Sequence, residues 1–241
     1  MADLVTGATG FTGGHLARHL LARGRTVRAL VRDRARAADL ERAGIELVEG
    51  DLRDRAALER AVDGVERVYH IAAMYRQAGL APDVYRAVNA LAVRDIIEVA
   101  AAAGVRRVMH CSTVGVHGDV EHPPANEDAP LKPGDVYQET KLEGERLARE
   151  AGERRGIEVT IARPTGIYGP GDRRLLKLFR GVAKGRFPIL GPGTIYYHLT
   201  YIDDLCEGFR LCAEHPAGAG RTYILAGGEV TTLNELVAIV A

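Results

Sequence analysis

The chain lacks an excess of charge of either sign and lacks long apolar runs. Its 241 residues hold 32 Lys plus Arg and 32 Asp plus Glu, so the formal net charge is zero. Without a global basic field, neither nucleic acid nor an anionic membrane surface is expected as a partner. The apolar runs are also far shorter than the roughly 20 residues that a membrane-spanning helix needs. These absences predict that the protein neither spans nor coats a membrane.

Cysteine is scarce, and the few cysteines show no metal-binding pattern. Cys111, Cys206 and Cys212 are odd in number and are not spaced as metal ligands are, so we expect reduced thiols and no metal site. The residues after Met1 lead directly into a predicted strand, which leaves no room for a signal peptide. Together these features predict a cytoplasmic location, and none of them identifies a function.

A glycine-rich stretch, TGATGFTG, lies near the N-terminus between a predicted strand and a predicted helix. The spacing of Gly7, Gly10 and Gly13 gives a tight turn, a close approach of the backbone to a pyrophosphate, and close packing of helix on strand. The N–H groups and partial positive charge of the helix N-terminus then stabilise phosphates. The alternative is a plain glycine-rich turn, which the position between strand and helix disfavours. The residues expected to bind a dinucleotide here are Gly7, Thr9, Gly10, Phe11, Thr12 and Gly13.

Short β-branched runs alternate with longer runs rich in Ala, Leu, Arg and Glu along most of the chain. This alternation is typical of strand–helix–strand units around a parallel sheet, with right-handed crossovers that stack helices on both faces. The predicted fold class is therefore α/β: a Rossmann-type doubly wound parallel sheet with a small C-terminal substrate lobe. Strands are predicted at residues 3–6, 26–31, 45–49, 67–71, 107–111 and 158–162, and helices at residues 13–22, 56–62, 84–103 and 136–155.

Two segments interrupt the alternation and indicate how the chain is divided. Residues 122–135, HPPANEDAPLKPGD, are rich in proline and acidic residues, and they either roof a site or merely connect two elements. The YGPGD sequence at residues 168–172 marks the passage into the lobe. We therefore expect a dinucleotide-binding domain over residues 1–165 and a substrate-binding lobe over residues 166–241, with the chain crossing back near residues 200–225.

The last residues predict a helix that is cut short. Thr232 and Glu235 have the spacing of a capping box, so a helix is expected to begin at Leu233. The chain reaches Ala241 only about two helical turns later. We therefore expect part of the lobe to be missing.

Two charged clusters fall within the predicted lobe. Arg173, Arg174 and Lys177 either bind an anionic group of a substrate or form a solvated helix face. The aspartate pair at residues 203–204 is expected to cap or anchor a helix that begins near Leu205. Neither cluster implies a metal.

The end of the second predicted strand bears on which dinucleotide is bound. A dinucleotide site usually has an acidic residue there, which binds the ribose hydroxyls and favours NAD. Here Val31 occupies that position and Arg32 follows it. A guanidinium can bind a 2′-phosphate bidentately, which slightly favours NADP over NAD; the alternative is a surface arginine. Asp51 and Leu52 after the third strand are expected to contact the adenine, and Ala72 and Ala73 after the fourth to lie against the dinucleotide.

Nine tyrosines occur in the chain, and only Tyr137 has a lysine four residues later, Lys141. On a helix this spacing places both side chains on one face, one turn apart. A free phenol has a pKa of about 10, and a neighbouring ammonium together with an oxidised nicotinamide lowers it toward the working range. The phenol is then able to exchange a proton with a substrate hydroxyl while the nicotinamide exchanges a hydride. Lys141 is also expected to hold the ribose hydroxyls of the nicotinamide.

A third participant is expected where the fifth predicted strand ends in Cys111-Ser112-Thr113. The hydroxyl of Thr113 is favoured to hydrogen-bond the substrate oxygen and orient it, and Ser112 is the alternative. Cys111 is not expected to act as a nucleophile, because no histidine is placed to activate it.

With these residues identified, the chain resembles the extended short-chain dehydrogenase/reductases of the NAD-dependent epimerase/dehydratase family. The resemblance runs essentially from end to end. It rests on TGATGFTG, Asp51-Leu52, HIAA at 70–73, Asn89, CSTVGVHG at 111–118, YQETK, RPTGIYGPGD at 163–172 and YIDDL at 201–205.

The resemblance implies specific roles for several of these residues. The family's catalytic residues fall on Thr113, Tyr137 and Lys141, and Asn89 falls in the cofactor-binding set. The backbone contacts with the nicotinamide fall on Pro164, Thr165 and Gly166. Members of the family also form homodimers, here through the helices at 84–103 and 136–155.

Three departures from the family pattern narrow the function. His117 stands where the family often has tyrosine, and Gly166 stands where many nucleotide-sugar members have an asparagine that contacts the substrate diphosphate. The sequence VRALVRD at 27–33 is similar to the NADP-using dihydroflavonol-reductase and steroid-dehydrogenase-like branches. The absence of that asparagine disfavours a nucleotide-sugar substrate.

We therefore predict an NAD(P)-dependent oxidoreductase that interconverts a secondary alcohol and a ketone. The alternative is a nucleotide-sugar epimerase or dehydratase with internally recycled NAD. A non-catalytic dinucleotide sensor is disfavoured, because the chain keeps both Tyr137 and Lys141. The partner is expected to be a small-molecule carbonyl or alcohol, whose identity the sequence does not specify.

Overall fold

The computed structural model describes residues 2–241, and its centre is one parallel sheet. Seven strands follow the order β3-β2-β1-β4-β5-β6-β9, and every neighbouring pair is parallel. In this order the chain starts near the centre and winds outward first one way and then the other, which confirms the predicted Rossmann-type doubly wound class. The strands are β1 (Ala2–Thr6), β2 (Thr26–Val31), β3 (Glu46–Glu49), β4 (Val65–His70), β5 (Arg107–Cys111), β6 (Glu158–Pro164) and β9 (Thr222–Leu225).

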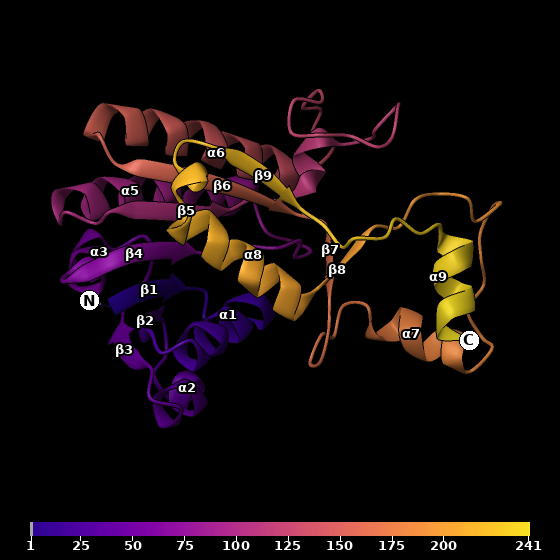
Figure 1. Ribbon diagram of the computed structural model, residues 1–241, viewed down its shortest axis with the longest axis horizontal. Coiled ribbons are helices and arrows are strands. Elements are labelled where there is room, and N and C mark those ends of the chain that lie inside the picture. Colours follow the sequence, from indigo (N-terminus) through magenta and orange to yellow (C-terminus); the bar gives the residue numbers. More distant parts are fainter. Residues whose placement is uncertain (1) are drawn as a thin grey trace.

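Helices cover both faces of this sheet (Figure 1). Helices α1 and α8 lie together on one face, and α3, α5 and α6 lie on the other. Among residues 2–241, none of the helices combines the length and the apolar character needed to cross a membrane. The helices are α1 (Phe11–Ala22), α2 (Ala38–Arg42), α3 (Arg55–Val62), α4 (Pro82–Arg86), α5 (Ala92–Ala102), α6 (Val136–Arg155), α7 (Leu176–Ala183), α8 (Ile202–Glu214) and α9 (Leu233–Val240), with short turns η1 (Ala35–Ala37), η2 (Ala87–Leu91), η3 (Val114–His117) and η4 (Pro216–Gly218).

The predicted elements are confirmed to within a residue or two at their ends, apart from the differences that follow. Helices α2 and α7 and the short strands Gly166–Tyr168 and Leu199–Tyr201 were not predicted. The helix expected at 84–103 is divided, because the π-helical turn η2 joins α4 to α5. The helix expected near Leu205 begins at Ile202, so the aspartates at 203–204 lie in its first turn and do not cap it. Strand β9 was not predicted, because its four residues are only half-buried at the sheet edge and form no long apolar run.

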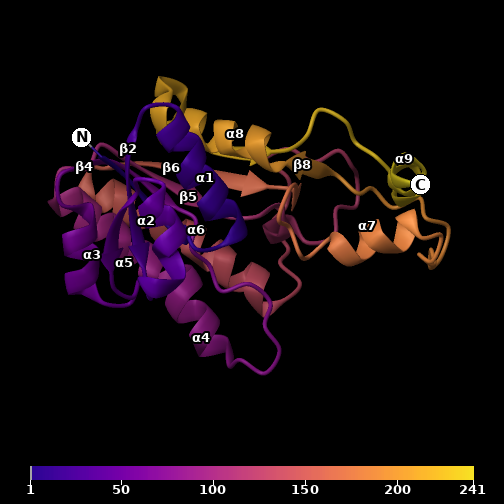
Figure 2. The ribbon, with the colours of Figure 1, turned by 90° about the horizontal axis from the view of Figure 1, so that it is seen from below.

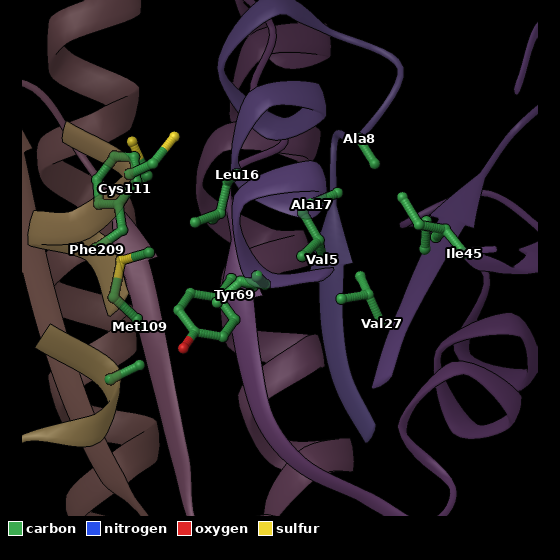
Figure 3. Close-up of a cluster of buried hydrophobic side chains, with 14 of the residues drawn as sticks. Val5, Ala8, Leu16, Ala17, Val27, Ile45, Tyr69, Met109, Cys111 and Phe209 are labelled. Carbon is green, nitrogen blue, oxygen red and sulfur yellow. The ribbon is translucent and has the colours of Figure 1, made fainter. Parts of the chain in front are cut away.

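Both faces of the sheet are buried, as expected for parallel strands. Successive residues of a strand point to opposite faces, so β4 sends Tyr69 toward α1 and α8, and Val68 toward α5 and α6. On the first face, Leu16 of α1 and Phe209 of α8 pack in the cluster that contains Tyr69 (Figure 3). On the other face, Ile96 of α5 packs in the cluster that contains Val68.

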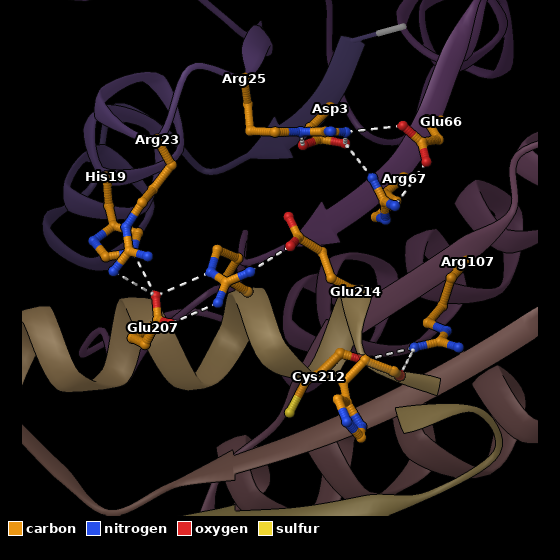
Figure 4. A network of polar contacts seen from close by, with 12 residues as sticks. Asp3, His19, Arg23, Arg25, Glu66, Arg67, Arg107, Glu207, Cys212 and Glu214 are labelled. Carbon is orange, nitrogen blue, oxygen red and sulfur yellow. Dashed lines mark hydrogen bonds and ion pairs between the residues drawn. The ribbon is translucent and has the colours of Figure 1, made fainter. Parts of the chain in front are cut away.

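Ion pairs connect the ends of the central strands, and a further ion pair connects α8 with α1. The buried carboxylate of Asp3 accepts hydrogen bonds from Nε and Nη2 of Arg25, at 2.7 and 3.0 Å. Glu66 accepts a hydrogen bond from the same guanidinium at 2.9 Å (Figure 4). On α8, Glu207 forms a 3.1 Å hydrogen bond with Nε2 of His19 on α1. These contacts fix α1 and α8 against each other.

Beyond β6, part of the chain leaves the sheet and forms a small second unit (Figure 1 and Figure 2). Strand β7 (Gly166–Tyr168) pairs in parallel with β8 (Leu199–Tyr201), and α7 and α9 contact each other farther from the main sheet. Helix α9 begins at Leu233 behind a capping box of Thr232 and Glu235, as predicted. The division of function between residues 1–165 and 166–241 stays a prediction, and residue 1 lies outside the described residues.

Replacing Phe209 by alanine should test the packing of α8 on the sheet. Phe209 is fully buried, so the truncation is expected to lower the free energy of unfolding by about 3–5 kcal/mol. Leu211 lies two residues away on the same helix and is 45% exposed, so Leu211→Ala should change it by no more than about 0.5 kcal/mol. Urea denaturation of both variants measures the difference, and equal effects would contradict the described packing.

Candidate active site

A large cavity opens at the carboxyl ends of the strands, next to the small second unit. Its volume is about 880 Å³. This edge of a doubly wound sheet, where the strand order reverses between β1 and β4, is the usual position of a ligand site. Nearly all the predicted site residues line it together: Gly7, Thr9, Gly10, Phe11, Thr12, Gly13, Arg32, Asp51, Leu52, Ala72, Ala73, Thr113, Tyr137, Lys141, Pro164, Thr165 and Gly166.

The turn after β1 brings backbone directly against backbone. Gly7 has φ +73°, and a Cβ there would lie 2.8 Å from the backbone nitrogen of Ala72. A Cβ on Gly13 would collide with the carbonyl oxygen of Gly7. Helix α1 begins behind Gly10, which provides no side-chain cap. The first N–H groups of α1 have no acceptor within the helix, and they are left for an anionic ligand.

Every second residue from 32 to 36, directly after β2, is an arginine, and these arginines differ in whether they form an ion pair. Arg34 forms an ion pair with Glu41. Within residues 2–241, Arg32 and Arg36 form no ion pair, and Arg32 lines the cavity. The end of β2 therefore presents an unpaired guanidinium one residue after the position at which dinucleotide sites usually have a carboxylate.

Asp51 and Leu52 follow β3 and line the same end of the cavity as Arg32. Asp51 accepts hydrogen bonds from Nε and Nη2 of Arg53, at 2.7 and 2.9 Å. The hydrogen bonds with Arg53 lower the pKa of Asp51 to about 2. Leu52 packs against the core cluster beneath α3. This end of the cavity therefore combines a fixed carboxylate with an apolar surface.

Helix α6 carries Tyr137 to the cavity wall. The helix begins after Asp135, whose carboxylate accepts a 2.9 Å hydrogen bond from a backbone N–H of the first turn and also pairs with Arg76. Removal from bulk water raises the pKa of Tyr137 above its ordinary value, and Arg76 and Arg174 offset only part of this effect. Desolvation of the phenolate therefore outweighs the nearby cations. The lowering of the pKa that is expected beside both Lys141 and an oxidised nicotinamide stays a prediction.

Lys141 lies one helical turn after Tyr137 and is 1% exposed. Its Nζ donates a 2.6 Å hydrogen bond to the carbonyl oxygen of Cys111. An ammonium has three N–H donors, so two of them are left for other partners. Burial lowers the pKa of Lys141. The side chain is thus held at a fixed point on the same wall as the phenol.

Two stacked histidines lie within the electrostatic reach of Lys141. The rings of His70 and His110 have centroids 5.5 Å apart, and Nδ1 of His70 is 2.9 Å from Oγ1 of Thr6. Burial, assisted by the charge of Lys141, lowers the pKa of His70 to about 3. His70 is therefore a neutral residue at the edge of the core, and it does not line the cavity.

Thr113 has the better geometry of the two candidate hydroxyl groups. Its Oγ1 accepts a 3.1 Å hydrogen bond from the backbone N–H of Gly115, which leaves its O–H available as a donor. Ser112 also lines the cavity but is only 3% exposed. The arrangement favours Thr113 as the group that reaches a ligand.

The cysteines are all free and buried. Burial raises the pKa of Cys111 to about 11, so its thiol is protonated near neutral pH and is a poor nucleophile. Within residues 2–241, no group of three or more His, Cys, Asp or Glu side chains is arranged to hold a metal ion.

Asn89 is the predicted site residue that does not line the cavity. Its carboxamide accepts a 2.7 Å hydrogen bond from the N–H of Met74 and donates one of 3.0 Å to the carbonyl oxygen of Met74. It also donates to Oγ1 of Thr140 on α6, at 3.2 Å. The predicted contact of Asn89 with a cofactor stays a prediction. The side chain is fully used in holding the loop after β4 against α6.

Three arginines that line the cavity were not predicted there: Arg53, which pairs with Asp51, and the more distant Arg76 and Arg174. The guanidinium of Arg76 lies 5.9 Å from the ring centroids of both Tyr75 and Tyr137. Arg174 lies 5.5 Å from the ring centroid of Phe11, whereas its sequence context had left it open as a substrate ligand or a solvated residue. Both come from irregular loops, so no periodic pattern in the sequence could have placed them.

A buried ion pair fixes α6 against the sheet. Arg163 of β6 donates hydrogen bonds to both carboxylate oxygens of Glu145, at 2.9 and 2.6 Å. Burial alone would raise the pKa of Glu145, but these hydrogen bonds hold it below its ordinary value. The same guanidinium contacts Nε2 of His117 at 3.1 Å and the carbonyl oxygen of Glu127 at 3.2 Å. Residues 122–135 are thereby tied to the core, and none of them lines the cavity, so they act as a connector.

The sheet order and the cavity are those of dinucleotide-binding α/β enzymes. The chain belongs to the NAD dependent epimerase/dehydratase family, whose model matches residues 4–226. This confirms the family resemblance that the motifs indicated.

Curated relatives and solved structures agree with this membership. Sterol demethylase protein B of Methylococcus capsulatus is 40% identical over 239 residues, which cover 96% of this chain and 71% of that protein. The 3 beta-hydroxysteroid dehydrogenase/Delta 5-->4-isomerase of Mycobacterium tuberculosis is 33% identical and covers 96% of this chain and 66% of its own. A double mutant of DesIV, a dTDP-glucose 4,6-dehydratase from Streptomyces venezuelae with NAD and DAU bound, is 31% identical with a TM-score of 0.85, over 100% of this chain and 80% of its own. The chain spans 59 to 71% of the length of the first curated relatives.

Replacing Arg163 by methionine should leave the buried carboxylate of Glu145 without its two short hydrogen bonds, so that the 3.4 Å contact with Arg149 is its remaining ion pair. We expect the free energy of unfolding at pH 7 to fall by about 3–5 kcal/mol. Arg149 also pairs with Glu145 but is 40% exposed, so Arg149→Met should cost no more than about 1 kcal/mol.

The pH dependence of this loss has a defined sign. Pairing lowers the folded pKa of Glu145, so its contribution is present above the ordinary glutamate pKa of about 4.3 and is lost as the pH falls. The difference in the free energy of unfolding between wild type and Arg163→Met should therefore become smaller at acidic pH. Urea denaturation at several pH values measures it, and a gap independent of pH would contradict a charge-based role.

Proposed function

We propose that the protein is an NAD(P)-dependent oxidoreductase that interconverts a secondary alcohol and a ketone in a small-molecule substrate. Family membership supports an enzyme with an NAD-type cofactor. Relatives named as a 3 beta-hydroxysteroid dehydrogenase/isomerase and as a 2-alkyl-3-oxoalkanoate reductase support exchange between hydroxyl and carbonyl. The observation that carries the proposal is that Thr113, Tyr137 and Lys141 line the same cavity as the glycine turn.

The residues present fit a dinucleotide. Gly7 and Gly13 leave a backbone cradle that a Cβ would fill, and the uncapped start of α1 offers N–H groups to a pyrophosphate. Bound here, the nicotinamide would supply or accept the hydride. Pro164, Thr165 and Gly166 line the same cavity as Tyr137. Their backbone is proposed to contact the nicotinamide, with Ala72 and Ala73 against the dinucleotide.

We assign the proton transfer to Tyr137. Its raised pKa keeps the phenol protonated near neutral pH, which suits donation of a proton to a ketone oxygen during reduction. The O–H of Thr113 donates a hydrogen bond to the same oxygen and holds it beside the phenol. The two remaining N–H groups of Lys141 hold ribose hydroxyls, and its charge stabilises the phenolate that forms.

The packing around Gly166 favours net oxidation or reduction over the epimerase and dehydratase alternative. A Cβ at Gly166 would lie 2.7 Å from Cδ2 of Leu199 on the paired strand β8. The asparagine that the family resemblance associates with nucleotide sugars would therefore have to displace the side chain of Leu199 at this position. An enzyme with net turnover consumes NAD(P)H stoichiometrically, whereas an epimerase regenerates its cofactor in each cycle.

Tyr137→Phe tests the proposed chemistry. With NAD(P)H and a panel of ketones, the wild type should show a sustained loss of absorbance at 340 nm, and the variant should lose about 10²- to 10⁴-fold in kcat/KM. Its Kd for NAD(P)H should stay within about twofold, because the ring is kept. Tyr223→Phe is the matched control, because the Tyr223 hydroxyl bonds the carbonyl oxygen of Ala217 outside the cavity. Unchanged turnover in Tyr137→Phe would refute the assignment.

The arginines after β2 support a preference for NADP. Arg32 lines the cavity without an ion-pair partner within residues 2–241, whereas Arg34 is paired with Glu41. A free guanidinium can meet a 2′-phosphate with two parallel hydrogen bonds. NADP is therefore proposed as the favoured cofactor, with NAD as the alternative.

Arg32→Ala should weaken NADPH binding by about tenfold to a hundredfold, which corresponds to the loss of a charge-assisted contact. NADH binding should change by less than about threefold, because NADH has no 2′-phosphate. Arg34→Ala removes an arginine two residues away that is already paired, and it should leave both affinities nearly unchanged. Calorimetric titration of both cofactors measures these changes, and equal NADPH affinity in Arg32→Ala and wild type would remove the reason for preferring NADP.

We also propose a cellular compartment, a substrate-binding segment and an oligomeric state for the protein. Three free, buried cysteines support a reducing compartment such as the cytoplasm. Residues 166–241 are proposed to bind the substrate, because β7 brings them to the cavity edge beside Pro164. A homodimer through α5 and α6 is proposed from the family resemblance alone.

A further inference from the structure

The geometry points to Arg174 as a cofactor-binding residue: we infer that it reaches from the second unit to the glycine turn and pairs with the pyrophosphate of the dinucleotide. This inference rests on the proposed function, and it adds a residue that lies outside the glycine motif. Its basis is a loop at residues 169–174 that is seated on the start of α1.

The loop is fixed at both ends. Gly169 has φ +150°, and a Cβ there would collide with Ile202 at the start of α8. The backbone N–H of Asp172 closes the turn with a 3.1 Å hydrogen bond to the carbonyl oxygen of Gly169. On the opposite side, Nε2 of His15 on α1 donates a 3.1 Å hydrogen bond to the carbonyl oxygen of Pro170. The loop therefore joins α8 and the second unit to the helix whose N-terminus follows the glycine turn.

Arg174 is held in one orientation over that N-terminus. Its Nε donates a 2.9 Å hydrogen bond to Asp172, and its Nη2 donates one of 3.0 Å to the carbonyl oxygen of Ile167. The Asp172 side chain is 4% exposed, whereas that of Arg174 is 43% exposed. Phe11, the first residue of α1, lies beneath the guanidinium with its ring centroid 5.5 Å away. An arginine fixed in this way loses little conformational freedom when it binds an anion.

One end of the guanidinium remains available. Within residues 2–241, Nη1 of Arg174 has no hydrogen-bond or ion-pair partner. Arg174 lines both the main cavity and a second concavity of about 460 Å³, and Thr9, Gly10 and Phe11 line both as well. A pyrophosphate on the uncapped end of α1 would therefore meet backbone N–H groups from one side and Nη1 from the other. Both kinds of donor attract the negative pyrophosphate, since the helix end supplies partial positive charge and Arg174 supplies a full positive charge.

Arg174→Ala and Arg173→Ala form the matched pair that tests this inference. Arg173 is the adjacent arginine, and it makes no hydrogen bond or ion pair within residues 2–241. Because ADP-ribose keeps the pyrophosphate but lacks the nicotinamide, it separates the pyrophosphate contact from the chemistry. We expect Arg174→Ala to bind NADH and ADP-ribose about tenfold to a hundredfold more weakly, as for the loss of one charge-assisted contact, and Arg173→Ala to stay within about twofold of wild type.

Calorimetric titration at two salt concentrations measures these affinities without turnover. The loss of affinity in Arg174→Ala relative to wild type should be smaller at high salt, because screening weakens the wild-type contact. Arg174→Lys keeps the charge without the planar fork and should give an intermediate affinity, and it keeps the test decisive if Arg174→Ala does not fold, as judged by circular dichroism. Wild-type affinity for ADP-ribose in Arg174→Ala, or equal losses in both alanine variants, would overturn the inference. Failure of the wild type to bind any dinucleotide would instead refute the proposed function itself.

Discussion

The contact of backbone with backbone at Gly7 is the constraint on which the rest of the site depends. Gly7 lies against the backbone of Ala72, and Gly13 lies against Gly7, with no space for a Cβ at either glycine. These contacts bring the end of β1, the segment after β4 and the first turn of α1 to one point. Because α1 then lies flat on the sheet, its unpaired N–H groups open onto the cavity, and α8 and the loop at 169–174 have a fixed surface to pack on.

Burial determines the properties of three charged side chains on α6 and β6. Lys141, Glu145 and Arg163 are charged side chains almost removed from solvent, and each is held by a short hydrogen bond. Such groups are costly to bury unless they are paired, so the ion pair and the Cys111 carbonyl fix α6 in one position. The same removal from water raises the pKa of Tyr137. Burial therefore accounts both for the fixed position of α6 and for the protonated state of the Tyr137 phenol, to which we have assigned the proposed proton transfer.

Local sequence signals predicted those parts of the fold whose causes are local. Helix α6 matches its predicted range because Asp135 caps its start and Gly156, in the left-handed conformation, ends it. Strand β9 was missed because its half-buried residues pair with β6 only after α8 has returned the chain to the sheet. Asn89 was predicted as a cofactor ligand from its place in a motif. Its hydrogen bonds to Met74 and Thr140 depend on the π-helical turn η2, which no residue pattern predicted.

The sequence by itself determined the doubly wound class and the family, because glycine spacing and alternating apolar runs are properties of short segments. It also predicts Tyr137 and Lys141 as the pair for proton transfer, from their four-residue interval. Only the tertiary structure decided the surroundings of those residues. It brought Arg76 and Arg174 to the cavity from loops about a hundred positions apart, left Arg32 unpaired where Arg34 is paired, and buried Tyr137 enough to raise its pKa. These outcomes depend on desolvation and on through-space distances between charges, which arise only when distant segments of the chain are packed together.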